Sequence, residues 1–84
     1  MEIHAELERQ VQSIFAQCPE LWGFSVRGED GELFVSDIGI APRLSAEQYG
    51  AIFQQIATTL SEFLEERPEA CEWLRGRTFA RTLH

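Results

Sequence analysis

The fold is decided by residues 21–38, which read LWGFSVRGEDGELFVSDI. Within residues 21–27 large apolar side chains alternate with small or polar ones, a period of two that predicts a strand with one buried face. The next four residues, 28–31, are Gly-Glu-Asp-Gly and supply turn positions that tolerate positive φ. A second strand over residues 32–38 completes a predicted β-hairpin. The side chains expected on the buried face of the first strand are Trp22, Phe24 and Val26.

The second predicted strand has a less regular pattern than the first. Leu33, Phe34 and Val35 are consecutive apolar residues, which is typical of a strand covered on both faces for part of its length. Helices are expected to cover one face. A partner chain is one candidate cover for the other.

A helix is predicted on each side of the hairpin. Residues 3–17 carry apolar side chains at spacings of three and four, and Pro19 stops this helix near Gln17. After the hairpin, residues 45–48, Ser-Ala-Glu-Gln, form a capping box that opens a helix to about Glu66. A helix of about 20 residues is about 30 Å long, enough to cross a small domain. The two apolar stripes are Ile3, Leu7, Val11, Ile14 and Phe15, and then Tyr49, Ile52, Phe53, Ile56, Leu60, Phe63 and Leu64.

The end of the chain predicts a short helix and a weaker strand. Residues 68–74 begin with a proline, which suits a first helical turn. Residues 77–83 alternate and contain two threonines, which favour a strand. The chain is therefore expected to be one domain, residues 1–84, of the α+β class: helix, β-hairpin, long helix, then a short helix and/or a C-terminal strand, in two layers. The sequence leaves the strand order and the interface of any dimer open.

The charge of the chain is acidic and unevenly distributed. Fourteen Asp and Glu against seven Arg, with no lysine and no asparagine, give a net charge of −7. This balance disfavours general binding to nucleic acid or to anionic membranes, and the absence of both AA-codon residues suggests a GC-rich, bacterial genome. Residues 73–84 hold three arginines and no acid. These arginines are expected to pair with glutamates of the same chain or of a second subunit, the alternative being contact with an anion or RNA.

Neither the start of the chain nor its cysteines carry a targeting or metal motif. No apolar run approaches the roughly 20 residues that a membrane span needs, and the start of the chain is acidic, unlike a secretory signal. Cys18 and Cys71 lie far apart and in no zinc or redox spacing. A cytoplasmic protein with two small buried thiols is expected.

The sequence carries no pattern typical of an enzyme. His4 and His84 have no partner at ligand spacing, and no serine lies in a nucleophile-elbow context. The acidic residues of the turn at 28–31 exclude a phosphate-binding loop. We expect no catalytic residue, no metal and no cofactor.

Nine aromatic residues are a large apolar load for two helices and a hairpin. Some of them are therefore expected at a subunit contact, with edge strands or the long helices of a homodimer paired around a two-fold axis. A monomer with all aromatics in one core is the alternative. The candidate interface residues are Trp22, Phe34, Trp73, Phe79, Arg75, Arg77 and Arg81.

These features predict a small non-enzymatic adaptor or regulatory protein that acts through protein–protein contacts. The hairpin and the exposed side of the second helix are the favoured surface. The alternatives are an acidic dimer that resembles a secretion chaperone, and a nucleic-acid-related protein that uses the C-terminal arginines. Membrane binding is not expected.

The order of helix, hairpin and long helix is similar to the first half of a roadblock domain, the dynein light-chain type. The hairpin segments at 22–26 and 29–37 resemble the hairpin of that family, and residues 44–64 resemble its second helix, so that the likeness covers about residues 3–66. The family continues through three further strands and a closing helix, where this chain has at most one strand. The resemblance implies a non-catalytic homodimer that docks on a GTPase or on a motor or motility complex, and it supplies no catalytic residue.

Overall fold

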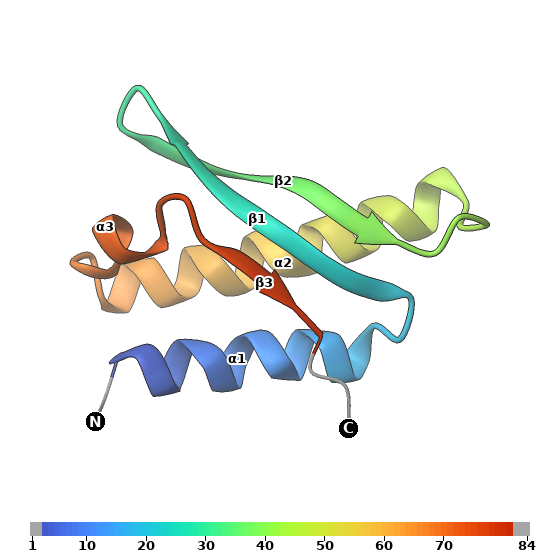
Figure 1. Ribbon diagram of the computed structural model, residues 1–84, viewed down its shortest axis with the longest axis horizontal. Coiled ribbons are helices and arrows are strands. Elements are labelled where there is room, and N and C mark those ends of the chain that lie inside the picture. The colour runs from blue at the N-terminus through green and yellow to red at the C-terminus, as the bar shows by residue number, and fades with distance from the viewer. Residues whose placement is uncertain (1–2, 82–84) are drawn as a thin grey trace.

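The chain folds into two layers, a three-stranded sheet and a pair of helices that lie against one of its faces (Figure 1). The computed structural model describes residues 3–81. The predicted α+β fold, with its short helix and its C-terminal strand, is confirmed. In chain order the elements are α1 (Ile3–Gln17), β1 (Leu21–Glu29), β2 (Glu32–Ile40), α2 (Ala46–Glu66), α3 (Ala70–Leu74) and β3 (Thr78–Ala80).

The sheet is antiparallel, and its strand order is β2-β1-β3. β1 is therefore the central strand, paired with its hairpin neighbour on one side and with the end of the chain on the other. The hairpin strands each extend two residues beyond the predicted 21–27 and 32–38. β3 has only three residues of the predicted 77–83, and residues 82–83 lie outside the described part of the chain.

The long helix begins where the capping box predicts. The side chain of Ser45 accepts a hydrogen bond from the amide of Gln48 at 3.1 Å, and the side chain of Gln48 accepts one from the amide of Ser45 at 2.9 Å. Both contacts satisfy amides that a helix start leaves unpaired. The helix ends at Glu66, where the amide of Arg67 still donates to the carbonyl of Phe63 at 3.0 Å.

The core lies between the helices and the covered face of the sheet. It is lined by aliphatic residues from α1 and α2 and by aromatic rings from four different elements. Phe24 of β1 contacts two other rings, with centroids 6.0 Å away at Phe15 and 5.3 Å away at Phe79. The largest fully buried side chains are Phe15, Phe24, Phe63, Leu7, Ile14, Leu21, Ile56, Leu74, Val11 and Val26.

Two opposite irregularities interrupt the pairing of β1 with β2. Between Ser25 and Gly23 the extra residue lies in β2, where Asp37 has a φ of 51°. Between Gly23 and Leu21 the extra residue lies in β1, at Trp22. The two β-bulges offset each other, so that the register before and after them is the same.

The bulge in β1 overturns one expectation from the sequence. Trp22 was expected on the buried face with Phe24 and Val26, but it is 56% exposed and Leu21 is buried instead. The alternation fails because a bulge places two successive side chains on one side of the strand.

Arg81 connects the end of the described chain to the end of α1. Its guanidinium donates to the carbonyls of Phe15 at 2.7 Å, Cys18 at 2.7 Å and Leu21 at 2.9 Å. The same group lies 5.5 Å from the centre of the Phe15 ring. The Phe15 carbonyl is one that the helix end leaves without a partner, because residue 19 is a proline and has no amide N–H. The other two carbonyls lie in the connection after α1 and at the start of β1.

No helix within residues 3–81 is both long enough and apolar enough to cross a membrane.

Candidate protein-binding surface

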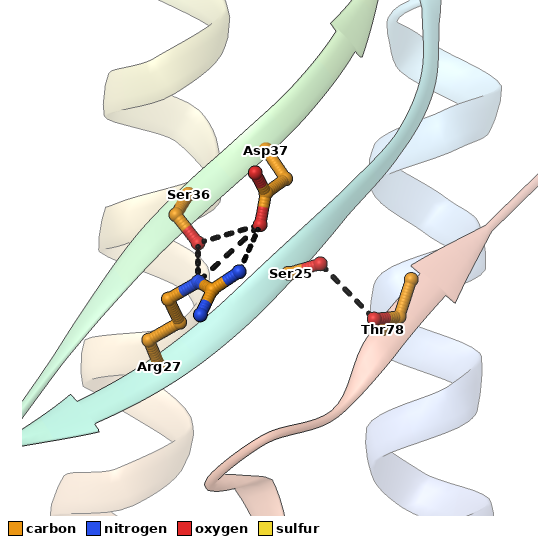
Figure 2. A network of polar contacts seen from close by, with 5 residues as sticks. All are labelled: Ser25, Arg27, Ser36, Asp37 and Thr78. Carbon is orange, nitrogen blue, oxygen red and sulfur yellow. Dashed lines mark hydrogen bonds and ion pairs between the residues drawn. The ribbon is translucent and has the colours of Figure 1, made fainter.

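In the part of the chain that the structure describes, one face of the sheet has no helix over it (Figure 2). In Figure 2 α2 passes behind β2 and α1 behind β3, while polar side chains stand on the near face. Arg27 donates to Ser36 at 3.0 Å and to Asp37 at 2.9 Å, and the Ser25 and Thr78 hydroxyls lie 3.0 Å apart. We call this surface the open face.

The centre of the open face is polar and its charges are internally paired. The hydrogen bond from Arg27 and the charge of its guanidinium lower the pKa of Asp37, and the Ser36 hydroxyl adds to this effect. Both charged side chains are more than half exposed. Because water screens such an ion pair, the pair contributes little to stability. Its hydrogen bonds hold the side chains of Arg27 and Asp37 together across the β2 bulge.

Trp22 stands at one end of the open face, beside glycines. A Cβ at Gly39 would lie 3.8 Å from the Cβ of Trp22, and Gly39 pairs with Gly23 in the sheet. At Gly23 a Cβ would lie 2.8 Å from the carbonyl oxygen of Phe79, so that only glycine fits where β1 approaches β3. The absence of side chains at the two glycines leaves the indole exposed.

A groove lies where β2 borders α2. Its volume is about 210 Å³. Phe34 on β2 and Phe53 on α2 line it and are 42% and 39% exposed. Nine of the ten lining residues are apolar, which is the composition of a binding groove rather than of a solvated surface. The lining residues are Val26, Leu33, Phe34, Val35, Phe53, Ala57, Leu60, Ser61, Leu64 and Leu74.

An uncharged stripe on α2 continues this groove along the helix. Its members recur at spacings of three and four, and all are exposed or half-buried. Tyr49, 41% exposed, lies one residue from the stripe near the start of the helix. The stripe consists of Ala46, Gly50, Phe53, Ala57, Ser61 and Leu64.

The predicted interface residues fall into different environments. Trp22 and Phe34 are exposed on the hairpin, whereas Phe79 is 7% exposed and belongs to the core. Trp73 is half-buried and stacks on His4, with ring centroids 4.1 Å apart. The structure thus separates the four aromatic candidates into two surface residues, one core residue and one residue in a stack.

The three C-terminal arginines also differ from one another. Arg81 binds the carbonyls at the end of α1, and Arg77 lies 4.1 Å from the centre of the Trp73 ring. Arg75 is exposed and packs its side chain over Gly28. None of the three forms an ion pair with an acid among residues 3–81, so the expected pairing with glutamates of the same chain is not seen there.

Sequence reasoning did not single out Phe53 and Tyr49 as surface residues. Both were placed in the apolar stripe of the second helix, which was expected to be buried. The signal that could have identified them as exposed is that the apolar stripe of this helix is wider than the side that packs against the core. Ile52, Ile56 and Phe63 already fill the side of the helix that faces the core, and Phe53 lies a third of a turn away.

Both cysteines are free. The Cys18 thiol is buried and donates to the side chain of Gln55 at 3.3 Å. Burial raises the pKa of this thiol, and the charge of Glu20 raises it further. A thiol in this environment stays protonated at neutral pH and acts as a small apolar group.

No protein-family model matches the chain, and neither a curated protein nor a solved structure matches it. The resemblance to a roadblock domain therefore stays a prediction.

Proposed function

We propose that the protein is a non-enzymatic adaptor or regulator that works by binding other protein chains, and that it does so as a homodimer. One observation carries the proposal. The large apolar side chains exposed in residues 3–81 are Trp22, Phe34, Tyr49 and Phe53, and all of them belong to the hairpin or to α2. A concentration of exposed aromatic rings on one part of a small domain is typical of a protein interface.

The compartment proposed for this function is the cytoplasm. The two free cysteines support it, because a reducing compartment keeps thiols unpaired. The roadblock resemblance suggests a GTPase or a motility complex as the first kind of partner to look for.

Nucleic-acid binding through the C-terminal arginines is less well supported. Arg81 donates to three carbonyls, and Arg77 lies over Trp73 and donates to its carbonyl at 3.3 Å. Of the three arginines, Arg75 alone has a side chain with neither a hydrogen bond nor a ring contact within residues 3–81. A single such arginine on a chain of net charge −7 is a weak phosphate site.

Affinity capture followed by a binding titration tests the proposal. The full chain is immobilised, partners are identified from the source cells, and one purified partner is titrated against Trp22→Ser, Phe53→Ser and the control Ala16→Ser on the exposed side of α1. An interface aromatic contributes about 2 kcal/mol, so that at least one aromatic variant is expected to weaken the Kd about thirtyfold while the control does not. Binding that both aromatic variants leave unchanged would contradict this surface.

A further inference from the structure

We propose that the groove and the free edge of β2 are covered by a second copy of this chain, related by a two-fold axis that runs β2 antiparallel to its counterpart. The inference rests on the homodimer of the proposed function and locates its interface. Four features of the β2–α2 side support it: an unpaired strand edge, a self-complementary charge pattern, an uncharged helix stripe and sufficient area.

The first feature is the edge of β2. This strand has nine residues, and within residues 3–81 the strand order β2-β1-β3 leaves it hydrogen-bonded to β1 alone. Its other edge presents backbone donors and acceptors that pair readily with another strand. Two such edges joined antiparallel would make one six-stranded sheet.

The second feature is the charge at the two ends of β2. At the hairpin end, Glu29 and Glu32 lie directly opposite each other and Asp30 lies between them in the turn. Like charges in that position repel each other. At the other end Arg43 is exposed and forms no ion pair within residues 3–81.

Antiparallel pairing brings these two ends together. With the two-fold axis at Ser36, the middle of β2, Glu32 lies opposite Ile40 of the second copy, and Arg43 follows just beyond it beside the acidic turn. Figure 1 shows the hairpin tip and the β2–α2 loop projecting at opposite ends of β2, as this pairing needs. The two-fold operation forms the contact twice, and parallel strands would instead bring acids together.

The third feature is the stripe on α2. It has no charged member over a helix of 21 residues, although the same helix carries four glutamates on its other sides. Small residues at Ala46, Gly50 and Ala57 allow the α2 of a second copy to approach closely, and Phe53 then enters the groove between the subunits.

The fourth feature is the area of this side. The molecule is 18 Å thick in its shortest dimension. A side of that thickness along a strand about 30 Å long covers about 540 Å² per subunit, near the lower limit of specific interfaces. A dimer with a micromolar Kd is expected.

Another occupant would satisfy only one end of the strand. A basic peptide added to β2 would pair with the acidic turn but would face Arg43 at the other end, and an acidic peptide would do the reverse. A second copy of this chain satisfies both ends at once, which is the reason for choosing it.

Sedimentation equilibrium at 1–100 μM tests the inference through charge reversal. The unaltered chain is expected to reach twice its mass of 9.6 kDa. Arg43→Glu is expected to weaken the dimer at least tenfold, as is Glu29→Arg combined with Glu32→Arg, and the chain with all three changes is expected to recover the original affinity. Arg77→Glu makes the same charge change at the other side of the sheet and is expected to leave the dimer intact.

Cross-linking provides a second measurement that does not depend on affinity. A residue at the two-fold axis meets its own copy, so that Ser36→Cys is expected to form an intersubunit disulfide on mild oxidation, within the Cα separation that a disulfide allows. Ser25→Cys, on the central strand, is the control. It is expected to form no intersubunit disulfide and therefore to run as a monomer on a denaturing, non-reducing gel.

A chain that remains monomeric at 100 μM overturns the inference, and so does a dimer that Arg43→Glu leaves unchanged. If the chain is a monomer and still binds a protein partner through Trp22, the groove is not a dimer interface, and the proposed adaptor function is unaffected. A dimer that recovers with the triple charge reversal, yet binds no partner, supports the interface and contradicts the adaptor function.

Discussion

The guanidinium of Arg81 lies where α1 ends and donates to the carbonyls of Phe15 in α1, Cys18 just after it and Leu21 at the start of β1. The sequence marks this residue only as one of three arginines in an acid-free segment, and it was a candidate for an interface. Nothing in its neighbours along the chain indicates the contact, because the carbonyls belong to residues 60 to 66 positions away. A long-range side chain to backbone contact of this kind needs the fold to be known.

Replacement of Arg81 by leucine is expected to lower the free energy of unfolding by about 2–4 kcal/mol, because three hydrogen bonds from a charged donor are lost and the Phe15 carbonyl at the end of α1 is left without a partner. Urea unfolding followed by circular dichroism measures it. Arg77→Leu is the matched control, since Arg77 is exposed and donates to a single carbonyl. Equal losses in the two variants would contradict the role assigned to Arg81.

Trp22 and Asp37 show what residue patterns predict poorly. The alternation of Trp22, Phe24 and Val26 is regular, yet the bulge exposes the first of them. Asp37 adopts a φ of 51° in the opposing strand, where aspartate is one of the few residues other than glycine that tolerate this region. Neither bulge has a glycine at the extra residue, which would have indicated a bulge in the sequence. The sequence therefore predicts the first strand correctly but not which of its side chains are exposed.

The helices and the hairpin were predictable because each carries a local signal. The capping box fixes the start of α2, and the paired glycines fix the turn between β1 and β2. α3 and β3 have only five and three residues, and the alternation over residues 77–83 indicates a strand without fixing its limits. The limits of β3 are set by its pairing with β1, which the sequence does not show.

The capping box of α2 makes a prediction about this element. Ser45→Ala is expected to destabilise the protein by about 1 kcal/mol, because the amide of Gln48 loses its acceptor. Ser45→Asp keeps an acceptor at the same position and is expected to stay close to the unaltered chain. Thermal unfolding of the three proteins measures the difference. A Ser45→Ala chain as stable as the original would show that the cap does not hold the helix start.

At the level of the whole molecule, the side formed by β2 and α2 differs from the rest of the surface in its charge pattern and in its apolar groove. The edge of β2, the groove and the uncharged stripe of α2 adjoin one another, with acids at one end and Arg43 at the other. The sequence predicted a surface on the hairpin and the second helix, and it did not predict which strand forms the edge. That depends on β3 pairing with β1 and leaving β2 free.

The thermal stability of a dimer depends on protein concentration. If a second copy binds with a micromolar Kd, an increase from 1 to 100 μM adds about 1 kcal/mol per chain and is expected to raise the Tm by about 4–8 °C. Scanning calorimetry at the two concentrations measures this. Arg43→Glu is expected to show a lower Tm than the unaltered chain at 100 μM, and a Tm of the unaltered chain that does not change with concentration would contradict the dimer.

The pairing of β3 with the central strand has a consequence for synthesis of the protein. A ribosome makes α1, the hairpin and α2 first. Until residues 78–80 are made, one edge of β1 has no strand to pair with, and until Arg81 is made, the Phe15 carbonyl at the end of α1 lacks its donor. The native sheet therefore cannot be completed until nearly the whole of this chain has emerged. Nascent chains halted before residue 78 are expected to be cut by protease, and chains extended past residue 81 and out of the ribosome are expected to resist it.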